Sequence, residues 1–228
     1  MNRKRPRQPT TPPASLFVRH RIPLAAAGLL LVLVVWGLWP DASVANLDSR
    51  GSAIIAFGDS LTSGFGAAEG EDYPARLAEL IGDPVVNAGR SGDTTESALE
   101  RIEPAVLSRD PRIVIVGLGG NDFLRSEPIA TTESNLRSIV RRIHDAGAMV
   151  VLLGFEFPSL NANYDAMYRR IAREQECLLI PDVLDGILRD PALRSDEIHP
   201  NAAGYRVLAE RVSGPAKELL KRADAARR

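Results

Sequence analysis

Cysteine is almost missing from this chain, because Cys177 is the only one among 228 residues. A lone cysteine excludes an internal disulfide, and its place in the apolar run 177–180 predicts a small buried side chain. No Cys/His cluster has metal-ligand spacing, so we expect no metal and no other cofactor. The formal net charge of -1 argues against nucleic-acid binding. Gly-rich phosphate-binding motifs of the P-loop and dinucleotide types are missing too.

Acidic residues are missing from the N-terminal segment, where residues 1–21 are basic, Pro-rich and predicted to be a disordered cytoplasmic tail. The uncharged run 22–39 follows, and as a helix it would span about 27 Å, close to the hydrocarbon thickness of a bilayer. One interpretation is a transmembrane signal-anchor. The other is a signal peptide cleaved near Ala45. Both place the domain after the linker 40–51 outside the cytoplasm, in the periplasm, either anchored in the inner membrane or secreted.

From residue 52 onwards, short apolar runs alternate with longer amphipathic stretches. The runs predict strands at 53–57, 84–87, 112–117, 148–153 and 177–180. The amphipathic stretches predict helices at 73–81, 94–107, 133–146, 164–175 and 201–220, the last broken or kinked at Gly214-Pro215. Near-continuous apolar strands alternating with helices predict an α/β domain over 52–222, a three-layer sandwich around a flavodoxin-like parallel sheet of about five strands.

Glycine and small polar residues follow several of these strands. The segments are 57–62 (FGDSLT), 87–93 (NAGRSGD), 117–122 (GLGGND) and 196–200 (DEIHP). Function in a parallel sheet collects at the carboxyl ends of the strands, so these segments are expected to meet. Each alone fits an ordinary turn.

Taken together, the segments contain the groups that acyl transfer needs: a nucleophile, a base, an orienting carboxylate and oxyanion donors. Three histidines are present. His20 lies in the basic tail, and His144 is predicted on the solvent face of a helix. His199 follows the last strand, with Asp196 three residues before it. The expected triad is therefore Ser60, Asp196 and His199.

These blocks together resemble those of the SGNH hydrolase superfamily, also called the GDSL esterase/lipase family, and they span residues 52–212. The resemblance implies that Ser60 is the nucleophile and that Asp196 and His199 complete the triad. It implies an oxyanion hole formed by the N–H groups of Ser60 and Gly92 and the Asn121 amide. Segments 86–95, 118–122 and 157–164 resemble the bacterial periplasmic thioesterase/lysophospholipase/arylesterase group.

The resemblance also implies a set of substrate-contacting residues: Asp59, Leu61, Asp122, Phe157, Pro158 and Ile198. Glu156 departs from the group's apolar or basic pattern and is expected to affect substrate choice. Arg125 is either a contact for an anionic substrate or a solvated loop residue.

The expected activity is hydrolysis of small-molecule or lipid esters or thioesters by a monomer. Two alternatives remain: a deacetylase of acetylated sugars on the same fold, and a non-catalytic membrane-tethered binding protein. An α/β-hydrolase is disfavoured, because no Gly-x-Ser-x-Gly elbow surrounds Ser60.

Overall fold

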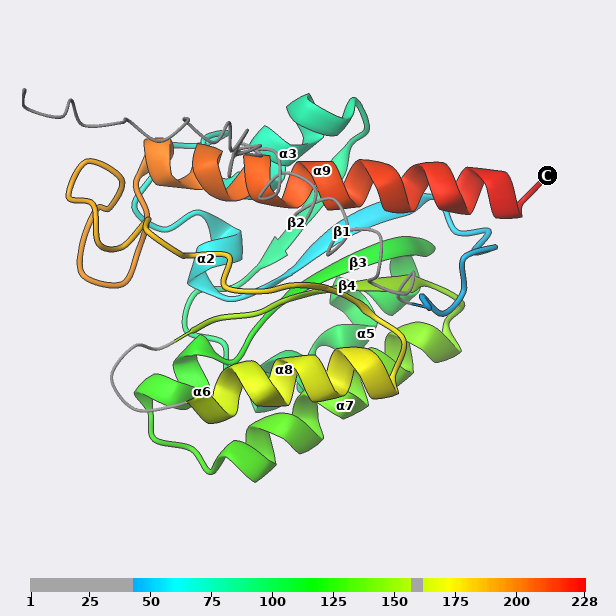
Figure 1. Cartoon of the computed structure of the whole chain (residues 1–228), viewed down its shortest axis with the longest axis horizontal. Helices are drawn as coiled ribbons and strands as arrows, with labels where there is room; N and C mark the ends of the chain where they lie inside the picture. The colour runs from blue at the N-terminus through cyan, green and yellow to red at the C-terminus, as the bar shows by residue number, and fades with distance from the viewer. Residues whose placement is uncertain (1–42, 157–161) are drawn as a thin grey trace, which may run out of the picture. The chain divides into compact units, whose positions relative to one another are not determined.

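A five-stranded, wholly parallel sheet forms the centre of the domain in a computed structural model that describes residues 43–156 and 162–228 (Figure 1). The strands are β1 (Ala53–Gly58), β2 (Val85–Gly89), β3 (Pro111–Gly117), β4 (Met149–Leu153) and β5 (Leu178–Ile180). Their order in the sheet is β2-β1-β3-β4-β5. The predicted α/β class and sheet are confirmed. The predicted N-terminal helix at 22–39 lies outside the described residues.

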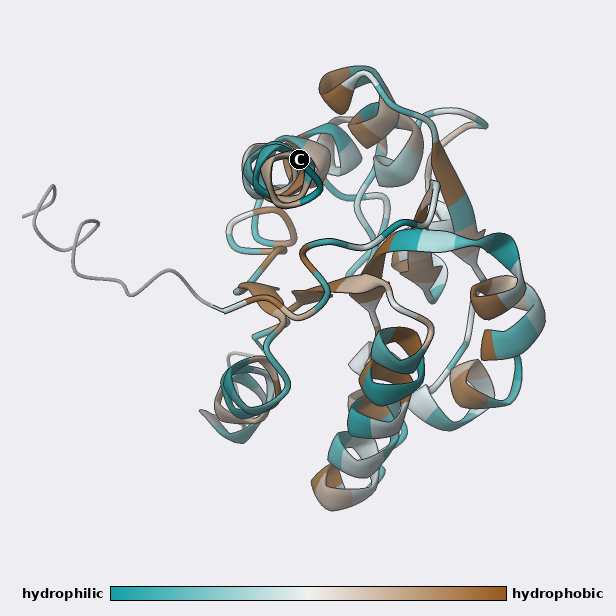
Figure 2. Ribbon diagram, turned by 90° about the vertical axis from the view of Figure 1, so that its right-hand side faces the viewer, coloured by the Kyte–Doolittle hydropathy of each residue, from teal (hydrophilic) through white to brown (hydrophobic). Residues whose placement is uncertain are grey.

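Helices cover both faces of the sheet. Helices α3 (Tyr73–Ile81) and α9 (Ala202–Ala226) pack together on one face. Helices α4 (Thr95–Glu100), α5 (Ile102–Ala105), α7 (Ile129–Asp145) and α8 (Ala162–Glu174) lie on the other (Figure 1). Because both faces are covered, the central strands β1 and β4 are apolar along their length, and all five residues of β4 are buried. Figure 2 shows hydrophobic residues along much of the sheet and helices banded with hydrophobic and hydrophilic residues.

Two prolines lie within helices that the sequence predicted, and only one of them interrupts its helix. The single helix predicted at 94–107 is wrong: it divides at Arg101 into α4 and α5, because Pro104 has no N–H to donate to a preceding carbonyl. The break predicted at Gly214-Pro215 is also wrong, since α9 continues through Pro215. Buried Val212, on one side of this proline, and the buried residues after it hold the helix against the sheet. Their packing offsets the roughly 3 kcal/mol that an internal proline costs.

Residues 43–51, predicted as part of a linker, pack against the end of the domain where the strands begin. Val44 is buried, and the Asn46 amide donates to the carbonyl oxygens of His144 and Ala148 at 2.9 and 3.0 Å. This part of the predicted linker is therefore structured. Among the described helices, none has both the length and the apolar character that crossing a membrane requires.

Candidate active site

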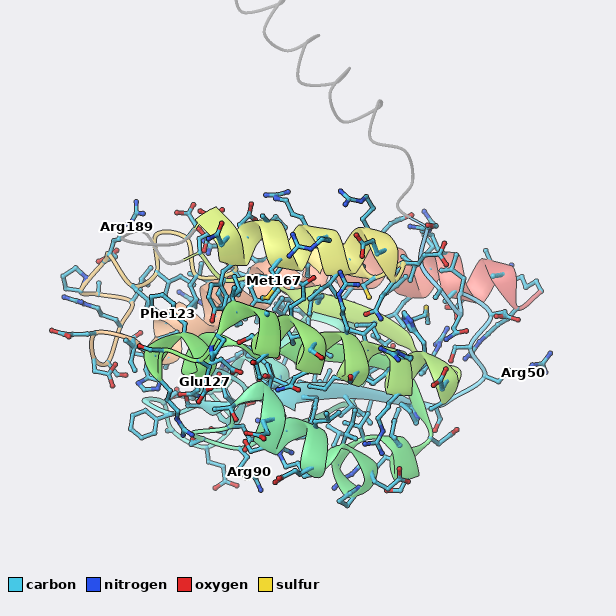
Figure 3. All side chains as sticks on the ribbon, turned by 90° about the horizontal axis from the view of Figure 1, so that it is seen from below. Arg50, Arg90, Phe123, Glu127, Met167 and Arg189 are labelled. Carbon is cyan, nitrogen blue, oxygen red and sulfur yellow. The ribbon has the colours of Figure 1, made fainter. Side chains whose placement is uncertain are left out.

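The segments singled out in the sequence meet at the carboxyl edge of the sheet. Two short helices begin there: α2 (Ser60–Ser63) after β1, and α6 (Gly120–Leu124) after β3. Sequence periodicity missed both, because four or five residues are too few to show a helical repeat. Figure 3 shows Phe123 and Arg189 at this end of the domain and Arg50, which precedes β1, at the opposite end.

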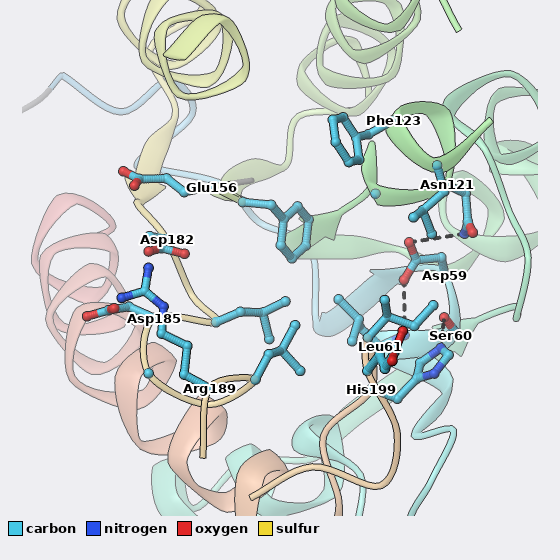
Figure 4. Close-up of a pocket in the computed structure, with 18 residues that line it drawn as sticks. Asp59, Ser60, Leu61, Asn121, Phe123, Glu156, Asp182, Asp185, Arg189 and His199 are labelled. Carbon is cyan, nitrogen blue, oxygen red and sulfur yellow. Dashed lines mark hydrogen bonds between the residues drawn. The ribbon is translucent and has the colours of Figure 1, made fainter. Parts of the chain in front are cut away.

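Ser60, His199 and Asp196 form a continuous hydrogen-bonded relay, of which Figure 4 shows Ser60 and His199. His199 Nε2 lies 3.0 Å from Ser60 Oγ, and His199 Nδ1 lies 2.8 Å from Asp196 Oδ2. Because a carboxylate only accepts, Nδ1 carries the proton, which leaves Nε2 free to accept from the serine hydroxyl. The structure thus brings the three predicted triad residues together in the arrangement that nucleophile activation requires.

The loop before α9 fixes the Asp196 carboxylate. Its Oδ1 accepts from the backbone N–H groups of Ile198 and His199, both at 2.8 Å. Partial desolvation pushes the pKa of Asp196 upwards, but these bonds and the imidazole outweigh it and hold the pKa below its ordinary value. Asp196 is therefore ionised at neutral pH and can orient His199.

The turn after β2 explains why glycine stands at position 92. Asp93 N–H donates to the Arg90 carbonyl at 3.1 Å, which closes a four-residue β-turn with Gly92 in its third position. Gly92 has φ +84°, whereas Ser91 has negative φ, so the turn is of type II. A type II turn needs positive φ at its third position, which glycine adopts without strain.

The candidate oxyanion donors lie in the segments that follow β1, β2 and β3. Asn121 lies in the first turn of α6, and its amide donates to the Asp93 carbonyl at 2.9 Å and, at 3.4 Å, to Asp59 (Figure 4). Ser60 opens α2, where a helix leaves its first N–H groups unpaired. Within the described residues, the N–H groups of Ser60 and Gly92 have no hydrogen-bond partner.

Two arginines that the sequence did not single out for this purpose hold the turn. Arg101 bonds to the buried Asp93 carboxylate at 2.5 Å, and its Nη2 donates to the carbonyls of Gly58 and Ala88, each at 3.0 Å. It thereby ties the ends of β1 and β2 to the turn. Arg125 donates to the Gly92 carbonyl at 2.9 Å, so its guanidinium is engaged by the protein rather than only solvated. Such arginines come from distant elements, which no local motif reveals.

Asp122, which the sequence predicted as a substrate contact, is bonded to another helix in this structure. Its carboxylate is buried, accepts from Thr95 N–H at 2.9 Å and from the Thr95 hydroxyl at 2.5 Å, and does not line the cavity beside Ser60. It joins α6 to α4 instead. The physical reason is that side chains along a short helix point in different directions, so Asn121 and Asp122 cannot both face the nucleophile.

Asp59 lines the cavity, but its carboxylate is also engaged by the protein: it caps α2 by accepting from Leu61 N–H at 3.0 Å. Burial raises its pKa to about 7, and the nearby carboxylates of Asp93 and Asp122 push the pKa the same way. From its ordinary value of 3.8 up to about 7, the folded state therefore keeps a proton that the unfolded state releases. The free energy of unfolding falls as pH rises through this window.

Replacing Asp59 with asparagine is expected to remove this pH dependence, because asparagine can still cap the helix without being ionised. The wild type should lose about 1 kcal/mol per pH unit relative to Asp59→Asn between pH 5 and 7. Urea unfolding of both proteins at pH 5, 6, 7 and 8 measures the difference. A stability difference that stays constant across these pH values would show that Asp59 does not titrate in this window.

A cavity of about 300 Å³ opens beside Ser60 and His199. Its lining is mostly apolar, from Leu61, Phe123, Leu124, Phe155, Leu184, Leu188 and Ile198. Glu156, Asp182, Asp185 and Arg189 lie on the side away from Ser60 and His199 (Figure 4). The predicted substrate contacts Leu61 and Ile198 thus border the cavity. Phe157 and Pro158 lie outside the described residues.

Similarity to known proteins points to the same chemistry as the geometry of the site. The sequence model of the GDSL-like lipase/acylhydrolase family matches residues 56–207. The thioesterase 1/protease 1/lysophospholipase L1 of Escherichia coli K12 is 32% identical over 175 residues, covering 73% of this chain and 84% of that protein. An arylesterase of Vibrio mimicus is 30% identical over 203 residues, covering 84% and 98%. A crystal structure of TesA aligns with a TM-score of 0.70 at 29% identity, covering 74% and 100%.

Proposed function

This chain belongs to the GDSL-like lipase/acylhydrolase family and is a carboxylic ester hydrolase, and we propose that it cleaves esters and thioesters through an acyl-enzyme on Ser60. The observation that carries the proposal is the relay from Asp196 through His199 to Ser60, at the edge of an apolar cavity. A relay of this kind activates a serine hydroxyl, and the cavity holds an acyl group beside it.

In the acylation step, Ser60 Oγ attacks the acyl carbonyl carbon while its proton passes to His199 Nε2. The carbonyl oxygen becomes an oxyanion, stabilised by the N–H groups of Ser60 and Gly92 and by the Asn121 amide, which gives up its long 3.4 Å contact with Asp59 to donate to it. When the intermediate collapses, the bond from the acyl carbon to the leaving oxygen or sulfur breaks. His199 gives its proton to the leaving alcohol or thiol, and the acyl group stays on Ser60.

Deacylation repeats the sequence with water. His199 takes a proton from the water, whose oxygen attacks the acyl carbon, and a second oxyanion forms in the same hole. Collapse breaks the bond to Ser60 Oγ, which receives the proton from His199. The carboxylic acid leaves, and Asp196, ionised throughout, stabilises the imidazolium formed in each half-reaction.

The cavity lining supports an uncharged fatty acyl group. Its apolar part is close to Ser60, where the first carbons of an acyl chain would lie. At the far side, burial raises the pKa of Asp182, and the neighbouring Glu156 and Asp185 add to the effect, so the carboxylates there repel one another. Three carboxylates against the single guanidinium of Arg189 leave this side of the lining net negative, which disfavours an acyl group ending in a carboxylate. The apolar lining also favours fatty acyl esters over acetylated sugars as substrates.

We propose a periplasmic location for the domain, tethered to the inner membrane through residues 22–39. The basic residues before this uncharged run support the orientation, since positive charge is retained on the cytoplasmic side. Secretion after cleavage near Ala45 is the alternative. A periplasmic site favours lipid-derived esters over cytosolic acyl thioesters as natural substrates.

The test is covalent labelling of the full chain, purified in a non-ionic detergent, with a fluorophosphonate probe. The expected result is one phosphonyl group, which peptide mass spectrometry locates on Ser60, together with loss of hydrolysis in a panel of ester and thioester substrates. Ser60→Ala is the control and should take up no label. Absence of labelling in folded wild-type protein, or labelling of another residue with loss of activity, would refute the acyl-enzyme on Ser60.

A further inference from the structure

Phe65 is an exposed aromatic ring beside the catalytic base. Its ring centroid lies 4.5 Å from that of His199, with the two planes tilted by 46°. The side chain is nevertheless 52% exposed, whereas large apolar side chains in this domain are mostly buried. Single exposed apolar side chains are common on protein surfaces, so the feature that sets Phe65 apart is the contact of its ring with the catalytic base.

The backbone of Phe65 is held in place from two directions. Its N–H donates to the Ser60 carbonyl at 3.0 Å, and its carbonyl accepts from the buried Tyr205 hydroxyl at 2.8 Å. These bonds tie the loop that carries the ring to the nucleophile and to α9. A ring on an anchored backbone loses little conformational freedom when a ligand packs on it.

Phe65 contacts His199 but is not part of the cavity lining. Ser60 and His199 both line the cavity, and Phe65 does not. In the proposed mechanism the acyl chain occupies the cavity, and the leaving oxygen or sulfur must approach His199 Nε2 to receive its proton. A leaving group that extends out of the cavity past His199 would meet the ring of Phe65, which contacts that histidine and is half exposed.

We propose that the exposed face of Phe65 binds the leaving group and selects esters of aromatic or long-chain alcohols and thiols over methyl and ethyl esters. This inference rests on the proposed function, because it assumes that acylation occurs at Ser60. An aromatic or extended alkyl group would cover the ring and remove apolar surface from water, whereas a methyl group is too small to reach it.

The competing explanation is that Phe65 only orients the imidazole of His199. The two explanations differ in how the loss of kcat/KM on removing the ring depends on the leaving group. If the ring merely positions His199, its loss weakens proton donation, which matters most for poor leaving groups such as methoxide. If the ring binds the leaving group, its loss affects aromatic esters most. The two roles therefore predict opposite orders of sensitivity.

The experiment measures kcat/KM of the full chain in detergent for 4-nitrophenyl butyrate and methyl butyrate, with acid release followed in a pH-stat. Phe65→Ala is expected to lower kcat/KM about three- to tenfold for the aromatic ester and by less than about twofold for the methyl ester. Phe65→Tyr retains a ring and should keep the wild-type ratio. Leu80→Ala removes another exposed apolar side chain, on α3, and should change neither value.

Phe65→Leu is a second variant in case the alanine protein unfolds, and it is expected to lower the aromatic-to-methyl ratio in the same direction. An equal loss for both esters, or a greater loss for the methyl ester, contradicts binding of the leaving group by Phe65 and leaves the proposed function intact. If the wild type cleaves neither ester nor any other in the panel and takes up no fluorophosphonate, the proposed function itself fails.

Discussion

Replacement of Ser60 or His199 by alanine is expected to lower kcat by about 10⁶-fold, and the double replacement should be no more damaging than either alone. The two side chains act as one unit across the 3.0 Å contact between Oγ and Nε2. Without the hydroxyl, the imidazole has no nucleophile to activate, and without the imidazole, the hydroxyl keeps its proton at neutral pH. Hydrolysis of 4-nitrophenyl butyrate by the two single variants and the double variant measures this.

His144→Ala is a matched control, because this histidine lies on α7, away from the relay, and should leave kcat unchanged. Activity in Ser60→Ala well above that of the double variant would mean that another nucleophile acts with His199. A double variant much slower than both single variants would show that the two residues contribute independently, which contradicts the relay.

Gly92→Ala is expected to lower kcat by about 10²–10³-fold, the loss typical of removing one oxyanion donor. Position 92 has φ +84° in a type II turn, a conformation that a residue with a Cβ rarely adopts. With alanine there, the turn relaxes towards type I, in which the peptide between residues 91 and 92 is rotated by about half a turn. The N–H that faces the oxyanion hole would then point away from it.

The control for Gly92→Ala is Gly82→Ala. Gly82 has φ +80°, and a Cβ on it would meet nothing within 4 Å, so the backbone strain is closely matched. Both variants should lose a similar amount of stability in urea unfolding, but Gly82 lies at the end of α3, outside the site, so only Gly92→Ala should lose activity. Unchanged kcat in Gly92→Ala would remove Gly92 from the oxyanion hole.

Most of the fold follows from local sequence patterns. An apolar run such as 148–153 indicates a segment buried on both faces, and a periodic stretch such as 73–81 indicates a segment buried on one face. Prediction failed where an element is too short for periodicity, as with α2 and α6, or where packing overrides a local signal, as at Pro215. Whether the helix continues through Pro215 depends on the packing of the buried residues around it in α9, which a rule based on local sequence does not include.

The sequence by itself determined the chemistry available to this protein. A serine and a glycine follow early strands, an asparagine follows the third, and an aspartate and a histidine stand three residues apart near the end. Parallel strands bring such segments to one edge of a sheet, so the sequence predicts that these residues lie close together.

Only the tertiary structure decided how that edge is supported and which side chains face the nucleophile. In the structure, Asp122 bonds to Thr95, and Arg101 and Arg125 bond to the turn that contains Gly92. The ring of Phe65 packs against His199. These contacts join residues from elements that are distant in the chain. Their partners are chosen by the packing of helices on the sheet, and no short motif records that packing.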